Sequence, residues 1–182
     1  MWLFFLTPII IITFIFYHAS FGGFGDMPDL EVLENPKTNL ASEVISSDGK
    51  TLGKYYFNDN RTPVTFEELP THLVDALIAT EDIRFYSHSG IDFKRTFAAV
   101  LKFGKDGGGS TITQQLAKLL FTGEGSRDII ERLSQKFKEY IIAVRLERHY
   151  TKNEIITQYL NLYDFGNNGD GIRSAARIYF GK

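Results

Sequence analysis

"GGGSTITQQLAKLL", residues 107–120, is the stretch that decides the fold, because it begins a helix with one polar and one apolar face. Three glycines run into Ser110 and Thr111, and Thr111 with Gln114 forms the Thr-x-x-Gln capping box that marks a helix N-terminus. The apolar positions recur at helical spacing and predict the buried side of this helix: Ile112, Leu116, Leu119 and Leu120.

The opposite face of the same helix is polar, since Gln114 and Lys118 are i, i+4 neighbours. A glycine-rich loop that enters a helix N-terminus can bind an anion, because free N–H groups and the helix dipole point at the ligand. The loop is not a Walker A motif, because no lysine directly precedes Ser110. On this motif alone, a flexible loop with an ordinary N-cap is an equal alternative.

Upstream, "TEDIRFYSHSGIDF" (residues 80–93) places five ionisable residues between two helical patterns: Glu81, Asp82, Arg84, His88 and Asp92. The helix expected from Leu69 onward ends at Glu81 and has one apolar face, made of Leu73, Leu77 and Ile78. A carboxylate at a helix C-terminus faces the negative end of the dipole, which disfavours its charged form. Glu81 is therefore a reasonable general base and a poor solubilising group.

Further helices are predicted on both sides of residues 107–120. We expect the helix within residues 91–104 to turn Phe93, Phe97, Val100 and Leu101 inward. The long helix within 127–150 has an apolar stripe made of Ile130, Leu133, Phe137, Ile141 and Val144. Lys136 and Glu139 are i, i+3 and on spacing alone could be a surface ion pair. Thr151 and Glu154 cap another helix, and residues 172–180 form the last one.

The N-terminus predicts a membrane anchor. Residues 1–25 contain no Asp, Glu, Lys or Arg, and about 20 such residues span the hydrocarbon core of a bilayer. The alternative is a cleaved signal peptide, but the stretch lacks a basic start and a clear small-x-small cleavage site. We expect a transmembrane anchor over 1–25 and a connector over 26–68 that contains a β-hairpin at Asp48-Gly49.

Composition limits the remaining possibilities. A chain of 182 residues with a net charge of −2 is enough for one globular domain and has no field that attracts nucleic acid. The chain has no cysteine and therefore no disulfide or thiolate metal site. Its four histidines show no metal-ligand spacing, so we predict no metal held by the protein alone.

Five blocks, in order, carry a resemblance: "ATEDIRFYSHSGID", "GGGSTITQQLAK", "QKFKE", "TKNEIITQYLN" and "GIRSAARIYFGK". Together they closely resemble the glycosyltransferase domain of class A penicillin-binding proteins, over about residues 69–182. The resemblance implies a mainly α-helical, lysozyme-like domain on the outer face of the bacterial cytoplasmic membrane, preceded by a transmembrane helix and a short β-hairpin connector.

The implied activity is polymerisation of lipid II. The family transfers the lipid-pyrophosphate-linked glycan to the 4-hydroxyl of an incoming lipid II sugar, with inversion to a β-1,4 link. Glu81 matches the catalytic glutamate, the general base, and Glu139 matches the second essential glutamate. The implied partners are lipid II, the growing glycan chain, the membrane and cell wall synthesis proteins, with Mg²⁺ or another divalent cation at the pyrophosphate.

Other residues of the site fall within the blocks or between them: Asp82, His88, Gly109, Ser110, Thr111, Gln114, Gln115, Lys118, Arg127 and Lys136. Asp82, His88 and Asp92 would order the loop after Glu81, while Lys118 and Lys136 would neutralise the leaving diphosphate. Arg127 and Arg132 both qualify as the arginine that the family has between the second and third blocks. The third block departs from the family, since it begins Gln135-Lys136 instead of Arg-Lys.

Two other functions compete with this interpretation. A lytic, lysozyme-like muramidase would share the fold and a catalytic glutamate, but it has no use for cations such as Lys118 and Lys136. A non-catalytic, membrane-anchored module would bind lipid II or glycan without turnover. It is suggested by the end of the chain after "YFGK", where the family continues with further helices, so we expect a C-terminally incomplete domain.

Overall fold

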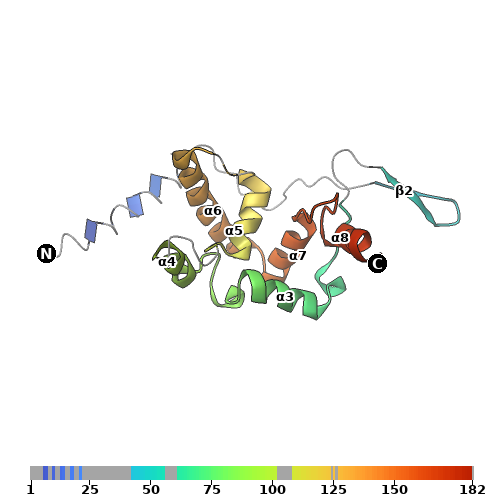
Figure 1. Ribbon diagram of the computed structural model, residues 1–182, viewed down its shortest axis with the longest axis horizontal. Coiled ribbons are helices and arrows are strands. Elements are labelled where there is room, and N and C mark those ends of the chain that lie inside the picture. The colour runs from blue at the N-terminus through green and yellow to red at the C-terminus, as the bar shows by residue number, and fades with distance from the viewer. Residues whose placement is uncertain are drawn as a thin grey trace.

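The computed structural model describes residues 6, 7, 10, 13, 14, 17, 18, 21, 42–55, 61–101, 108–123, 125 and 127–181. Their main body is helical, as the sequence predicts, and carries a hairpin at one side (Figure 1). Most of the anchor expected over residues 1–25 lies outside the described residues. Within the described part of the chain, no helix is both long and apolar enough to cross a membrane.

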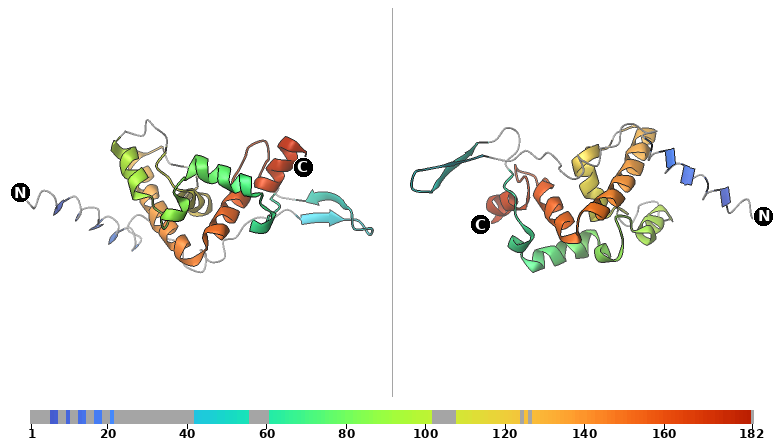
Figure 2. Two further views of the ribbon diagram at one scale, coloured as in Figure 1. Left: turned by 90° about the horizontal axis from the view of Figure 1, so that it is seen from below. Right: turned by 180° about the vertical axis from the view of Figure 1, so that it is seen from behind.

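The hairpin forms where the Asp48-Gly49 pair predicts it. Strand β1 (Ser42–Ile45) pairs antiparallel with β2 (Thr51–Tyr55), and Ser42 lies opposite Tyr55. Gly49 has a φ of 79°, which a residue with a side chain rarely adopts, so the turn requires glycine here. Both further views show the hairpin extending away from the helices (Figure 2).

The helices follow the predicted order, with short turns between them. The α-helices are α3 (Thr71–Glu81), α4 (Phe93–Leu101), α5 (Ile112–Ala117), α6 (Ile129–His149), α7 (Lys152–Leu162) and α8 (Ile172–Phe180). The turns are η1 (Phe66–Glu68), η2 (Phe85–Ser87) and η3 (Lys118–Thr122), of which η3 is a π-helical turn continuing α5. Thr111 caps α5 by accepting from the Gln114 N–H, and Thr151 and Glu154 form the capping box of α7.

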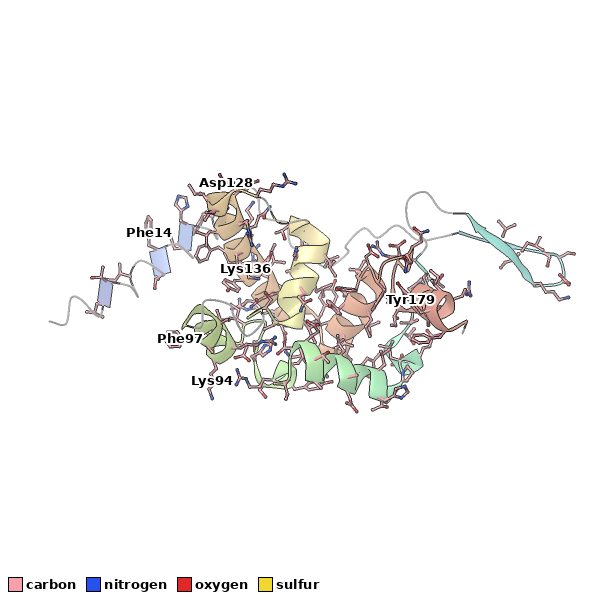
Figure 3. The ribbon with its side chains drawn as sticks, viewed as in Figure 1. Phe14, Lys94, Phe97, Asp128, Lys136 and Tyr179 are labelled. Carbon is pink, nitrogen blue, oxygen red and sulfur yellow. The ribbon has the colours of Figure 1, made fainter. Side chains whose placement is uncertain are left out.

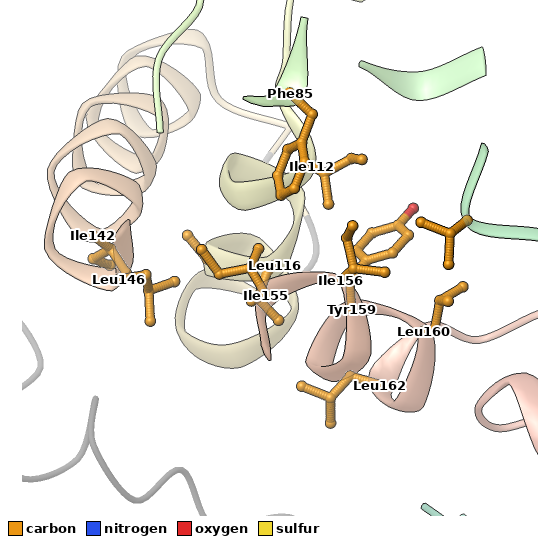
Figure 4. Packing of buried hydrophobic residues seen from close by; sticks show 12 residues of the cluster. Phe85, Ile112, Leu116, Ile142, Leu146, Ile155, Ile156, Tyr159, Leu160 and Leu162 are labelled. Carbon is orange, nitrogen blue, oxygen red and sulfur yellow. The ribbon is translucent and has the colours of Figure 1, made fainter. Parts of the chain in front are cut away.

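Helix α5 is the centre of the core. It packs against both α6 and α7, between which it lies in Figure 1. Its apolar side chains Ile112 and Leu116 are fully buried, whereas Leu119 in the following turn is exposed. The cluster around α5 draws on the loop after α3 and on α6 and α7 (Figure 4): Phe85, Ile142, Leu146, Ile155, Ile156, Tyr159, Leu160 and Leu162.

The orientation predicted for α4 is wrong. Phe93 and Phe97 are 74% and 65% exposed, and Figure 3 shows Phe97 at the outer edge of the molecule. The opposite side of α4 faces the domain, because Gly109 approaches Thr96 and Ala99 there. Hydrophobic periodicity correctly separated the two faces of α4. The face that packs against the domain is the one with Thr96 and Ala99, and the face with the large apolar side chains is exposed.

The first turns of α6 also differ from the prediction. Ile130 and Leu133 are exposed, because the beginning of α6 extends past the core. The buried side of α6 lies further along the helix and consists of Glu139, Ile142, Ala143 and Leu146. The apolar residues of the first turns are therefore available to something other than the core.

Gly90 fixes the loop after α3 against α5 and α6. Its carbonyl oxygen accepts from Thr111 Oγ1 at 2.7 Å and from Gln114 Nε2 at 3.2 Å. Its φ is +88°, and a Cβ here would lie 2.8 Å from the carbonyl carbon and oxygen of Ala143. No residue other than glycine fits this position without moving α6.

We predict that Gly90→Ala lowers the free energy of unfolding by roughly 2–4 kcal/mol, because it adds backbone strain and a clash with α6. Chemical denaturation monitored by circular dichroism measures this loss. Gly181→Ala is the matched control, since Gly181 also has a positive φ but open space around it. An equal loss in both variants would contradict the close approach of Gly90 to Ala143.

Candidate active site

One cavity of about 740 Å³ opens between the end of α3, the beginning of α5 and the first half of α6. Most of the residues that the sequence singled out come together in its wall: Glu81, Ser110, Gln114, Gln115, Lys118, Lys136 and Glu139. Further lining residues that the sequence analysis did not assign to the site include Arg95, Leu119, Ile129, Leu133 and Tyr163. The cavity therefore holds two carboxylates and several cations.

Glu81 is the last residue of α3 and is half-buried. Its Oε2 accepts a hydrogen bond from Gln115 Nε2 at 2.8 Å. Within the described part of the chain, Oε1 has no hydrogen-bond partner. One carboxylate oxygen is thus fixed by the protein and the other is left for a ligand.

Asp82 follows Glu81 and is 1% exposed. Its carboxylate lies 3.0 Å from His88 Nε2 and accepts from the N–H of Ile112, the first residue of α5, at 3.2 Å. Neither Asp82 nor His88 lines the cavity. Their contacts join the loop after α3 to the N-terminus of α5, which fixes the direction in which Glu81 leaves its helix.

Asp92 closes the same loop. Arg84 donates from Nε and Nη2 to the two Asp92 carboxylate oxygens, both at 2.8 Å, and the Arg95 N–H donates at 3.0 Å. Burial alone would raise the pKa of Asp92, but the Arg95 N–H and the Arg84 guanidinium outweigh it and lower that pKa. The Arg95 side chain in turn donates to the Glu81 carbonyl oxygen, so α4 also holds the end of α3.

Lys136 and Glu139 are more than a surface pair. Lys136 Nζ lies 2.6 Å from Glu139 Oε2 and 2.8 Å from Ser110 Oγ, and Glu139 is buried. Lys136 also lies over the Tyr140 ring, 5.5 Å from its centroid (Figure 3 labels Lys136 on α6). The Lys136 ammonium is therefore held between α6 and the loop before α5.

Lys118 and Arg132 add positive charge to the same wall. Lys118 is exposed at the start of η3 and has no hydrogen-bond or ion-pair partner among the residues that the structure describes. Of the two arginines that the sequence left open, Arg132 lines the cavity and Arg127 does not. Geometry thus favours Arg132 as the arginine of the site.

Three of the expected site residues shape the backbone around the cavity. Thr111 is fully buried and joins α5 to Gly90 through its hydroxyl. Gln114 is also buried, lines the cavity and donates to the same carbonyl. Gly109 lies so close to α4 that a Cβ there would be 3.0 Å from Ala99 Cβ.

Two tyrosines near the cavity were not identified from the sequence: Tyr159 within α7, and Tyr163 directly after its end. Tyr163 lines the cavity, and Tyr159 donates to Gln115 Oε1 at 3.0 Å. Their spacing of four residues places them on one helix face, which is the only signal that the sequence offers. Without the position of Gln115 relative to α7, that face could equally belong to the core.

The described residues contain no group of three or more His, Cys, Asp or Glu side chains that could hold a metal. The carboxylates at the cavity are Glu81 and Glu139. Mg²⁺ is commonly bound through one or two carboxylates together with substrate phosphates. These two carboxylates are compatible with that mode of binding. Among the described residues there are too few metal-binding side chains to hold the ion without the substrate.

Comparison with known proteins identifies the class to which this fold and site belong. The family model described as "Transglycosylase" matches residues 48–182. The chain is 38% identical over 161 residues to penicillin-binding protein 1A of Escherichia coli K12, covering 86% of this chain and 18% of that protein. It is 42% identical over 148 residues to penicillin-binding protein 1F of Bacillus subtilis 168, covering 79% of this chain and 20% of that protein.

The chain therefore belongs to the transglycosylase family, the glycosyltransferase domain of class A penicillin-binding proteins. It spans about a fifth of the length of the curated relatives that it matches, such as penicillin-binding protein 1A of Aquifex aeolicus, of which it covers 21%.

Because of Asp92, the free energy of unfolding should fall as the pH is lowered into the acid range. The folded-state pKa of Asp92 is lowered from 3.8, so its contribution to stability is complete above about pH 5 and is lost as pH falls through the folded-state pKa. We expect Asp92→Asn to lower the urea midpoint at pH 7, with a difference from wild type that shrinks below about pH 4. Asp75→Asn, an exposed carboxylate on α3, is the control. A difference independent of pH would refute this role.

Proposed function

We propose that the chain is a peptidoglycan glycosyltransferase that polymerises lipid II into β-1,4-linked glycan strands and releases lipid pyrophosphate. The observation that carries this proposal is the cavity itself, in which the free oxygen of Glu81 and the cations Lys118 and Lys136 share one wall. A transfer from a diphosphate-linked sugar to a hydroxyl needs a base and an anion site together.

Glu81 acts as the general base. Its Oε1 takes the proton of the acceptor 4-hydroxyl while the resulting oxygen attacks the anomeric carbon of the donor sugar. The new C1–O4 bond forms as the bond from C1 to the diphosphate oxygen breaks, so attack from the opposite face inverts the anomeric configuration. The proton ends on Glu81, and the electron pair leaves with the lipid diphosphate.

The cations stabilise the leaving group. The diphosphate develops negative charge in the transition state, and preorganised cations and N–H donors lower the energy of that charge. Lys118, Arg132 and Lys136 are charged donors at the cavity, in addition to Arg95, which donates to the Glu81 carbonyl oxygen. The N–H groups of the Ser110-Thr111 turn lie at the beginning of α5. Glu139 holds Lys136 in position through their 2.6 Å ion pair.

A divalent cation such as Mg²⁺ would add to this neutralisation. It would be held mainly by the diphosphate oxygens, and Glu139 would supply a carboxylate from the cavity wall. Its chemistry would be charge neutralisation of the leaving diphosphate. The proton transfer at Glu81 does not depend on it.

The apolar part of the wall supports a lipid-linked substrate. Leu119, Ile129 and Leu133 line the cavity and are exposed, which is unusual for a site that binds only sugars and phosphates. The working location is the outer face of the bacterial cytoplasmic membrane, with the N-terminal segment as the anchor. A lytic muramidase would share the helical fold and a catalytic glutamate, but it would not need the cations of this cavity.

Replacement of Glu81 by Gln should reduce glycan polymerisation by about 10³-fold, because the acceptor hydroxyl loses its base. The assay incubates the purified chain with fluorescent lipid II and Mg²⁺ in detergent and separates the products on a gel. Asp75→Asn serves as the control and should give the wild-type ladder. Release of small glycan fragments from preformed peptidoglycan, with no ladder, would instead favour the muramidase.

The choice between the two arginines is testable in the same assay. We expect Arg132→Ala to reduce turnover at least 10-fold, since one charged donor to the diphosphate is lost. Arg127→Ala should change turnover less than about twofold, because Arg127 is exposed away from the cavity wall. The reverse order of effects would contradict the assignment of Arg132 as a donor to the diphosphate.

A further inference from the structure

Three side chains from three different helices form one hydrogen-bonded chain that ends at Glu81. Tyr159 of α7 donates from its hydroxyl to Gln115 Oε1 at 3.0 Å. Gln115 of α5 donates from Nε2 to Glu81 Oε2 at 2.8 Å. The chain runs from the core to the cavity, because Tyr159 is 3% exposed whereas Gln115 and Glu81 line the cavity.

The direction of this chain is fixed by chemistry. An ionised carboxylate only accepts hydrogen bonds, so the Gln115 amide must present its NH₂ group to Glu81. The carbonyl oxygen of Gln115 then faces Tyr159, whose hydroxyl must donate. A Gln115 amide turned by 180° would place its oxygen against the Glu81 carboxylate, which is repulsive because both groups only accept hydrogen bonds.

Tyr159 is suited to this task because it is a rigid and permanent donor. Its ring lies in the hydrophobic cluster and packs against the Tyr163 ring, with 5.3 Å between the centroids. Burial, and after it the neighbouring Tyr163 and Glu81, raises the pKa of Tyr159 well above its ordinary value of 10.0. The phenol therefore keeps its proton at neutral pH and stays available as a hydrogen-bond donor.

We infer that Tyr159 is a positioning residue which, through Gln115, holds the Glu81 carboxylate so that Oε1 faces the acceptor hydroxyl. The inference rests on the proposed function, because it assigns Glu81 the role of base. Tyr159 touches no substrate, and its effect passes through the orientation of one amide. Deleting its hydroxyl releases the Gln115 amide to rotate and removes the fixed direction of the base.

Tyr159→Phe tests this directly in lipid II polymerisation. We expect kcat to fall about 10-fold, with KM for lipid II changed less than about twofold, because the variant affects the base and leaves the diphosphate site intact. Tyr179→Phe is the matched control, since its hydroxyl also donates to a carbonyl, that of Phe165, at 2.9 Å, but lies outside the cavity wall. Equal activity of the two variants would overturn the inference.

A double-mutant cycle separates positioning from a merely structural role. If Tyr159 acts only through Gln115, Tyr159→Phe should cost nothing further in a Gln115→Ala background. An additive loss in the double variant would show that the Tyr159 hydroxyl acts independently of Gln115 and would overturn the inference. Should Tyr159→Phe fail to fold, 3-fluorotyrosine at position 159 keeps the shape and strengthens the donor. It should shift the acid limb of the pH profile to lower pH, and an unshifted limb counts against positioning.

The inference about Tyr159 can also be tested without enzymatic activity, so its failure can be told apart from failure of the proposed function. If the wild-type chain forms no glycan, the inference can be tested by NMR on the Gln115 side-chain amide. Its ¹⁵N resonance should shift in Glu81→Gln, which weakens the hydrogen bond from Nε2 by removing the acceptor's charge, and also in Tyr159→Phe, which removes the hydrogen bond to Oε1. A resonance that does not respond to Tyr159→Phe would refute the chain of contacts whatever the enzyme's activity.

Discussion

The buried carboxylate of Asp82 is the interaction on which the rest of the site depends. A carboxylate that is 1% exposed is costly unless it is paired and hydrogen-bonded. Asp82 obtains its partners from His88 and from the N–H of Ile112 at the positive end of α5. The residue before it in the chain is Glu81, so the interaction that anchors the loop also restrains the backbone at the proposed base.

Helix α5 links the two chemical halves of the cavity. Its N-terminus receives Asp82, its apolar side fills the core between α6 and α7, and its polar side carries Gln115 toward Glu81. Lys118 directly follows α5, at the first position of the π-helical turn, and lines the cavity wall. One short helix thus contacts the proposed base, Glu81, through Gln115 and is followed directly by the cation Lys118.

The sequence predicted the helices and the residue types of the site because both depend on local patterns. Capping boxes and helical spacing located α5 and α7, and the five blocks located Glu81 and Glu139. Periodicity could not decide which face of α4 packs, so Phe93 and Phe97 were assigned to the core although they face outward. The choice of Arg132 over Arg127 depends on where α6 starts relative to the cavity. The anchor over 1–25 stays a prediction.

The chain of contacts from Tyr159 to Glu81 could not be predicted for a different reason. Its members come from three helices separated by many residues, and each looks ordinary alone: a core tyrosine, a helix-face glutamine and a helix-end glutamate. The last C=O groups of a helix have no partner within that helix, so groups from outside it must satisfy them. The domain compensates with fixed groups from its neighbours: the side chain of Gln115 holds the Glu81 carboxylate, and Arg95 holds the Glu81 carbonyl. These two contacts come from α5 and α4, so the proposed base is held from two other helices while its Oε1 makes no hydrogen bond within the described part of the chain.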